Sequence, residues 1–335
     1  MGCNFQLSIL AALLILSILQ EVTEVNGIGV NYGLLGNNLP PPSRTIGVLR
    51  SRGVRKIRIF TPDHGVLDAL RGSGIEVFIG TLNEDLPALA NDPWFASNWV
   101  RTHVAPYANN VRISGVVAGN EAAVGPYAGR ITGAMQNLDN ALRAMGIHVP
   151  VTTAVSYGVM GASYPPSQGS FKVGVMRDVA RFLSSKGYPL LANIYPYYAY
   201  VSDPGHIQSS YALLKNDGSV VVHDGNLVYT NLLDAMVDAV YSALERVGAG
   251  NVRVIVSETG WPSDAGLYAD IRSAQEYNNN LARLIRSGRG TPKRPWMKRE
   301  AYIFAMYNEN LKPPGIENHW GLYYPNLQEV YHVNL

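Results

Sequence analysis

The sequence predicts an α/β protein built as a single (β/α)8 TIM barrel, and three observations support this fold class. Eight short apolar runs alternate with segments of helical periodicity along the 335 residues, which is the pattern of successive βαβ units. No G-x-G-x-x-G motif follows the first run, so an open doubly wound sheet that binds a dinucleotide is the weaker alternative. No linker or shift in composition divides the chain, and one domain is therefore expected.

The predicted strands are short apolar runs. Val252, Val254, Ile255 and Val256 illustrate the pattern, because a run of β-branched residues fits a strand that is covered on both faces. In chain order the strands are expected at 28–33, 56–60, 76–81, 111–119, 149–155, 189–195, 251–258 and 301–307.

The segments between these strands have the spacing of amphipathic helices. They are expected at 42–50, 64–71, 87–109 in parts, 127–145, 175–186, 231–247 and 272–287. Pro42 suits the first turn of a helix, and Gly146, Gly187 and Gly248 suit helix ends. Aspartate-glycine pairs at 217–218 and 224–225 are typical of turns, and they predict a small hairpin insertion at 211–229, after the sixth strand.

Residues 1–27 resemble a secretory signal peptide, which leaves 28–335 as the barrel domain. The apolar segment 8–19 is too short to span a bilayer, and Val25-Asn26-Gly27 is a plausible cleavage region. This predicts secretion. Cys3, the one cysteine, lies inside the signal, so no disulfide and no cysteine-based metal site is expected in the mature protein.

Composition narrows the function classes. Hydrophobic residues make up 47% of the chain and charged residues 16%, with a formal net charge of +2, so neither a disordered protein nor a nucleic-acid-binding protein is expected. The basic segment 293–299 is expected to be a solvated loop. The seven histidines are scattered without ligand spacing, and neither a metal nor another cofactor is predicted.

The segment 251–266 holds the most informative residue, Glu258, at the end of the seventh predicted strand. An ionised carboxylate there is costly unless it has partners or a chemical role. By itself Glu258 is most simply a helix cap. The G-W-P sequence at 260–262 weakens that interpretation, because an aromatic ring beside a carboxylate is typical of a sugar site.

A barrel brings the carboxyl ends of its strands together at one face. That face would collect Tyr32, Glu121, Tyr195, Glu258 and Glu309. Glu121 and Glu258 follow strands on opposite sides of the barrel, so their carboxyl groups could lie about 5 Å apart, the separation found in retaining glycosidases. The preceding residue, Asn120, is placed to bind a sugar 2-hydroxyl.

The chain resembles plant family 17 of the glycoside hydrolases, the endo-β-1,3-glucanases of the pathogenesis-related type. The motifs that carry the resemblance run through the mature chain: I-G-V-N-Y-G at 28–33, N-L-P at 38–40, A-G-N-E at 118–121, S-Y-P-P-S at 163–167, N-I-Y-P-Y-Y-A-Y at 193–200, V-I-V-S-E-T-G-W-P-S at 254–263, G-T-P-K-R-P at 290–295, N-E-N-L-K at 308–312 and G-L-Y-Y-P-N at 321–326. The resemblance implies a (β/α)8 barrel and retaining hydrolysis of β-1,3-glucan.

In this family Glu258 matches the nucleophile and Glu121 the acid/base. Glu309, Lys312 and Glu317 match a supporting charged cluster, for which a salt-bridged loop is an equal alternative. The chain departs from the usual family residues at Phe60, Asp63, Ala118 and the segment 81–84. These departures bear on contacts with the substrate rather than on the reaction.

Four aromatic residues, Tyr32, Tyr195, Tyr197 and Trp261, are expected either to line sugar subsites or to pack in the core. Tyr195 alternatively hydrogen-bonds Glu258. A mixed-linkage β-1,3-1,4-glucanase and a glucan-binding defence protein with weak activity stay open as alternative functions. A monomer without a membrane anchor or nucleic-acid partner is expected, located outside the cell in the apoplast or cell wall rather than in the vacuole.

Overall fold

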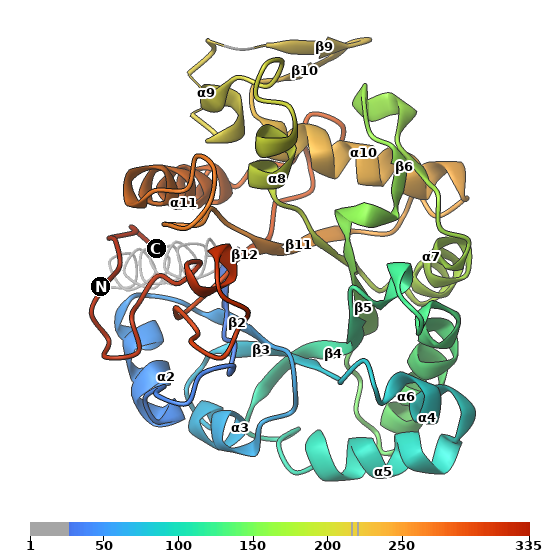
Figure 1. The fold of residues 1–335 in the computed structure, drawn as a ribbon. Helices are drawn as coiled ribbons and strands as arrows, with labels where there is room; N and C mark the ends of the chain where they lie inside the picture. Colours follow the sequence, from blue (N-terminus) through green and yellow to red (C-terminus); the bar gives the residue numbers. More distant parts are fainter. Residues whose placement is uncertain (1–26, 216, 220) are drawn as a thin grey trace, which may run out of the picture.

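Eight parallel strands close into a barrel in the computed structural model (Figure 1), which describes residues 27–335 except 216 and 220. The predicted signal peptide, Gly27 apart, lies outside the described residues. The strands are β1 (Ile28–Asn31), β2 (Lys56–Ile59), β3 (Glu76–Gly80), β4 (Arg112–Asn120), β5 (Val151–Ser156), β8 (Leu190–Asn193), β11 (Val254–Thr259) and β12 (Ala301–Ile303). Each pairs with its neighbour in this order, and β12 closes onto β1. The predicted fold class is therefore confirmed.

The barrel interior is a packed core. One residue from each of six strands forms a buried cluster, separate from the larger apolar layer between strands and helices: Phe78, Val117, Ala154, Leu191, Ile255 and Tyr302. Because bulky side chains fill the barrel, the open space for a site lies at its carboxyl end. The residues of β11 are buried along its whole length, as the run of β-branched residues predicts.

Helices cover the outside of the barrel (Figure 1). They are α2 (Pro42–Ser51), α3 (His64–Leu70), α4 (Leu86–Asn91), α5 (Pro93–His103), α6 (Ile131–Ala144), α7 (Val175–Lys186), α8 (Pro196–Ser202), α9 (Ser209–Ala212), α10 (Leu232–Arg246) and α11 (Ile271–Arg286). Side chains of Asp63, Asn231 and Asp270 cap α3, α10 and α11 by accepting from backbone N–H groups. The predicted helical region 87–109 is two helices, because Asp92 and Pro93 begin a new one.

Two hairpins extend from the barrel. The predicted insertion after the sixth strand is present as β9 (Val222–Asp224) and β10 (Leu227–Tyr229). A second hairpin, β6 (Met160–Ala162) with β7 (Ser170–Phe171), replaces the loop expected after the fifth strand. The backbone N–H and hydroxyl of Ser167 both donate to Asp224, at 2.6 and 2.7 Å, so the two insertions support each other.

The C-terminal segment corrects the predicted end of the eighth strand. The strand ends at Ile303 rather than at residue 307, because Ala305 bonds through its backbone with Trp320 and Leu322. Residues 304–335, all described, form no α-helix. Instead Arg52, the residue after α2, donates to the carbonyl of Val333 at 2.7 Å, and Asn278 of α11 donates to the hydroxyl of Tyr331 in this segment. The last residues therefore occupy the position between α2 and α11.

Candidate active site

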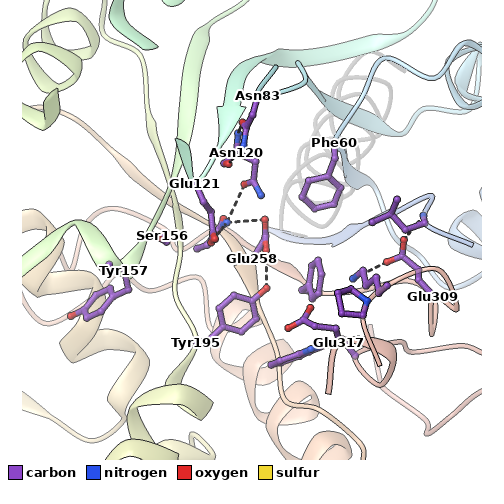
Figure 2. A pocket seen from close by; sticks show the side chains of 18 of the residues that line it. Phe60, Asn83, Asn120, Glu121, Ser156, Tyr157, Tyr195, Glu258, Glu309 and Glu317 are labelled. Carbon is purple, nitrogen blue, oxygen red and sulfur yellow. Dashed lines mark hydrogen bonds and ion pairs between the residues drawn. The ribbon is translucent and has the colours of Figure 1, made fainter. Parts of the chain in front are cut away.

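A cavity of about 1230 Å³ opens at the carboxyl ends of the barrel strands (Figure 2). Residues that line it lie at or just after the carboxyl ends of all eight strands, from Tyr32 after β1 to Phe304 after β12. Because the cavity extends across the whole mouth of the barrel, it can accept a long chain molecule. No group of three His, Cys, Asp or Glu side chains in the described part of the chain is arranged to hold a metal ion.

Glu121 and Glu258 meet at the centre of this cavity through Asn193. The Asn193 Nδ2 donates to Oε1 of Glu121 at 2.9 Å and to Oε1 of Glu258 at 2.8 Å. The two oxygens are therefore separated by at most the two bonds laid end to end, below roughly 6 Å. This upper limit on the oxygen–oxygen distance is shorter than the roughly 6.5–9.5 Å that separates the carboxyl groups of an inverting pair. Figure 2 shows both carboxyl groups pointing toward each other.

Irregularities in two strands aim these carboxyl groups. In β11 the register against β8 shifts between Val256 and Glu258, and in β4 the register against β5 shifts between Val117 and Asn120. A bulge turns the next side chain toward a new direction, and bulges are common beside active sites. Glu121 itself has a φ of 56°, in the left-handed region. This conformation is costly for a side chain other than glycine and is typical of functional positions.

Arg58 is the charge partner of Glu258. Its side chain is 1% exposed, and the guanidinium donates from Nη1 to Oε1 of Glu258 at 2.7 Å and from Nη2 to Oδ1 of Asn120 at 2.8 Å. The ring of Phe60 covers it, with 4.7 Å from the guanidinium carbon to the ring centroid. Burying a carboxylate without a cation is costly, so Arg58 supplies the charge partner that Glu258 requires at this position.

Further hydrogen bonds fix the orientation of the pair. Tyr195 donates its hydroxyl to Oε2 of Glu258 at 2.8 Å, as the alternative prediction for this residue expects. Burial, together with the charge of Glu258, raises the pKa of Tyr195 well above its usual value, so the phenol remains a donor. Ser257 donates to Oδ1 of Asn193 at 2.7 Å, which turns the Asn193 NH2 group toward the carboxylates.

Asn120 is held on both sides. Its backbone N–H donates to Oδ1 of Asn83 at 2.8 Å, and the side-chain NH2 of Asn83 donates to the backbone carbonyl of Asn120 at 2.9 Å. Its own Oδ1 accepts from Arg58 and from Asn193. Its side-chain NH2 makes no hydrogen bond with any described residue and faces the cavity that Asn120 lines, where it is available to a bound molecule.

Glu121 is the group whose protonation the site alters. Burial and the nearby charge of Glu258 raise the pKa of Glu121, although the Asn193 hydrogen bond and Arg58 oppose the shift. The two carboxyl groups thus differ in environment. Glu258 is paired with the Arg58 guanidinium, whereas burial disfavours the charged form of Glu121. A difference in environment of this kind is typical of carboxyl pairs whose members have different chemical roles.

We expect Glu121→Gln to stabilise the fold at neutral pH but not in acid. Below the ordinary pKa of 4.5 the carboxyl is neutral in both the folded and the unfolded chain. As the pH rises through the elevated folded pKa, ionisation is disfavoured only in the folded state, so the wild type loses stability that the neutral glutamine retains. Urea unfolding at pH 4 and pH 7 measures this, and a variant that is equally stabilised at both values would contradict it.

Glu309 and Lys312 form a buried ion pair in the cavity wall. Oε2 of Glu309 lies 3.0 Å from the Lys312 Nζ, and Oε1 accepts from the backbone of Leu35 at 2.7 Å. A Cβ on Gly33 would lie 2.5 Å from both carboxylate oxygens, so this pair explains the glycine. The pair connects the loop after β1 to the C-terminal segment, as the alternative prediction of a salt-bridged loop expects. Both side chains also line the cavity.

The remaining predicted substrate-binding residues fall into two groups. Glu317 lines the cavity and accepts from Tyr198 at 3.4 Å. Tyr32 borders the cavity but is buried, and its hydroxyl donates to Thr45 at 3.3 Å. The structure does not bring Tyr197 or Trp261 to the cavity: both are buried, and their rings pack against each other at 5.1 Å between centroids.

Several residues that build the site escape the sequence prediction. Arg58 and Asn193 are polar residues inside apolar strand runs, and that placement is a signal the sequence does contain. Trp320 had no such signal, since it follows the last strand in an irregular segment. Its ring packs 5.1 Å from that of Tyr195 and lines the cavity.

Comparisons with known proteins find similar sequences and a similar solved structure. The family model described as Glycosyl hydrolases family 17 matches residues 28–335. The chain is 46% identical over 311 residues to glucan endo-1,3-beta-glucosidase GV of Hordeum vulgare, covering 90% of this chain and 96% of the relative. Lichenase-2 of the same species is 42% identical, covering 93% and 99%. A solved structure titled as that of two plant beta-glucan endohydrolases with distinct substrate specificities has a TM-score of 0.88 at 41% identity, covering 92% of this chain and 100% of that chain.

Proposed function

The chain belongs to the glycosyl hydrolases family 17, and from this premise we propose that it is a secreted, retaining endo-glycosidase that hydrolyses β-1,3-glucan. One observation carries the proposal: Glu121 and Glu258 share the amide of Asn193 at the centre of an open cavity. The short separation supports retention. The opening along the barrel mouth supports cleavage within a chain rather than at its end.

In the first step Glu258 is the nucleophile. Its carboxylate forms a bond to the anomeric carbon while the bond from that carbon to the bridging oxygen breaks. The proton of the Glu121 carboxyl passes to the departing oxygen. The raised pKa of Glu121 favours the protonated form that this step requires, and Arg58 and Tyr195 hold the nucleophile in place.

In the second step water replaces the enzyme on the sugar. Glu121, now a carboxylate, removes a proton from water, the water oxygen bonds to the anomeric carbon, and the Glu258 carboxylate is released. Glu121 is then protonated as at the start. The unpaired NH2 of Asn120 is placed to donate to the sugar 2-hydroxyl, a contact that strengthens as positive charge develops on the ring.

The linkage that is cut has one specific alternative. The lichenase among the relatives supports a mixed-linkage β-1,3-1,4-glucanase with the same two carboxyl groups. Relatives named glucan endo-1,3-beta-glucosidase support the β-1,3 assignment. A glucan-binding protein with weak activity is disfavoured, because both carboxyl groups and the residues that orient them are present.

Reducing-sugar release separates these functions. We expect the wild type to release reducing ends faster from linear β-1,3-glucan than from mixed-linkage glucan, and the products to retain the β-configuration when observed by NMR. Glu258→Gln serves as the inactive control. Activity confined to mixed-linkage glucan would reject the substrate, α-configured products would reject the mechanism, and equal activity in the control would reject the site.

Secretion rests on the segment 1–27, whose apolar core predicts a signal peptide. No helix in residues 27–335, with 216 and 220 left out, is long and apolar enough to span a membrane. N-terminal sequencing of the protein recovered from the medium of expressing cells tests this part of the proposal. A mature chain that still begins at Met1 would reject it.

A further inference from the structure

The loop 287–300, which joins α11 to β12, presents an exposed indole. It leads into the amino end of β12 and so lies at the face of the barrel opposite to the active site. Trp296 is 71% exposed. The sequence predicts a solvated loop at 293–299, and Trp296 and Lys298 are exposed as this predicts, although other residues of the loop make specific contacts.

The backbone of the loop closes on itself. Gly290 donates to the carbonyl of Pro295 at 3.1 Å, and Arg299 donates to the carbonyl of Arg289 at 3.3 Å. A Cβ on Gly290 would lie 2.6 Å from the carbonyl oxygen of Met297 and closer still to that of Arg294. The two sides of the loop therefore approach as closely as glycine alone permits.

One face of α10 anchors the loop. Asp238 accepts from the backbone N–H of Lys293 at 2.8 Å. Tyr241, one turn later, donates to the Met297 sulfur at 3.1 Å. These contacts hold Lys293 and Met297, on either side of Trp296, against α10, whereas the indole itself stays exposed.

The same loop carries two exposed cations. The side chains of Arg289 and Lys298 are exposed and make no hydrogen bond or ion pair with any residue that the structure describes. The guanidinium carbon of Arg294 lies 5.9 Å from the indole centroid, and its charge is shared with Glu245 at 2.5 Å. The surface formed by Arg289, Trp296 and Lys298 thus combines a flat apolar face with free positive charge.

We infer that this surface binds an acidic polysaccharide, one that carries carboxylates on its sugar rings. The indole supplies an apolar face for a pyranose ring, and Arg289 and Lys298 pair with the uronate carboxylates. A neutral glucan would leave both cations without a partner. A nucleic acid would require a denser basic surface than a chain of formal net charge +2 provides. The site would hold the enzyme on an acidic matrix without occupying its active site.

Affinity electrophoresis in gels that contain polygalacturonate tests the inference. We expect wild-type protein to be retarded at low salt and released at high salt. Trp296→Ala should weaken binding about fivefold or more, the loss expected for a central aromatic contact, and the double variant Arg289→Ala/Lys298→Ala should weaken it and reduce its salt dependence. Trp94→Ala/Arg101→Ala is the matched control, because both residues are exposed on α5, away from this loop.

Three outcomes would overturn the inference: no retardation of the wild type, equal binding of Trp296→Ala and the control, or equal competition by neutral β-1,3-glucan or duplex DNA. Hydrolysis of a soluble β-1,3-glucan oligosaccharide should be unchanged in every variant. Failure of the surface site would therefore leave the proposed hydrolysis intact, and the thermal unfolding midpoint of each variant shows that it is folded.

Discussion

Replacing Glu258 with glycine is expected to lower kcat on β-1,3-glucan about 10⁴-fold or more, a loss typical of removing a nucleophile. Glu121, which shares the Asn193 amide with Glu258, cannot replace it in the first step because it is needed as the acid. Added azide should restore turnover of an activated aryl β-glycoside. Since azide then enters from the side that Glu258 occupied, the product should be the α-glycosyl azide.

Glu121→Gly is the matched control for this experiment. Glu258 still forms the glycosyl-enzyme with an activated leaving group, and azide then attacks from the opposite side to give the β-glycosyl azide. NMR of the two products assigns the roles of both carboxyl groups at once. The β-azide from Glu258→Gly, or hydrolysis at the wild-type rate, would contradict the assignment.

Replacing Arg58 with methionine is expected to have the second-largest effect. The change leaves Glu258 buried at 5% exposure without its cation, and breaking a buried pair in this way costs about 3–5 kcal/mol. We expect kcat to fall about 10²–10³-fold, the range found when one preorganised donor is removed. Urea unfolding and kinetics on soluble β-1,3-glucan measure the two effects.

A double variant distinguishes a lost charge partner from a packing defect. Arg58→Met/Glu258→Gln removes both charges and should recover most of the stability, although it cannot recover activity. The pH dependence gives a further test: Arg58 lowers the pKa of Glu121, so Arg58→Met should move the alkaline limb of kcat/KM to higher pH. A double variant as unstable as the single one, with an unmoved alkaline limb, would reject the role of Arg58.

The order and type of the main elements follow from the sequence because they depend on local pattern. Strands that are covered on both faces must be apolar throughout, so the eight runs are visible without any contact information. The strand ends, and hence the positions of Glu121 and Glu258 at one mouth, follow from the topology alone. The end of the last strand depends on backbone hydrogen bonds with Trp320 and Leu322, and its prediction was wrong. The β6/β7 hairpin was expected as a loop, and the bonds of its Ser167 to the distant Asp224 could not be predicted from the local sequence.

The site was predicted in part, for the same reason. The sequence by itself determined which two carboxyl groups follow strands four and seven and that a barrel brings them together. Tertiary structure decided the rest: Asn193 bridges the pair, Arg58 from β2 neutralises one member, and Tyr197 and Trp261 turn into the core instead of the cavity. Such contacts join residues more than sixty positions apart, and side-chain direction at a bulge is set by packing and register rather than by the local sequence.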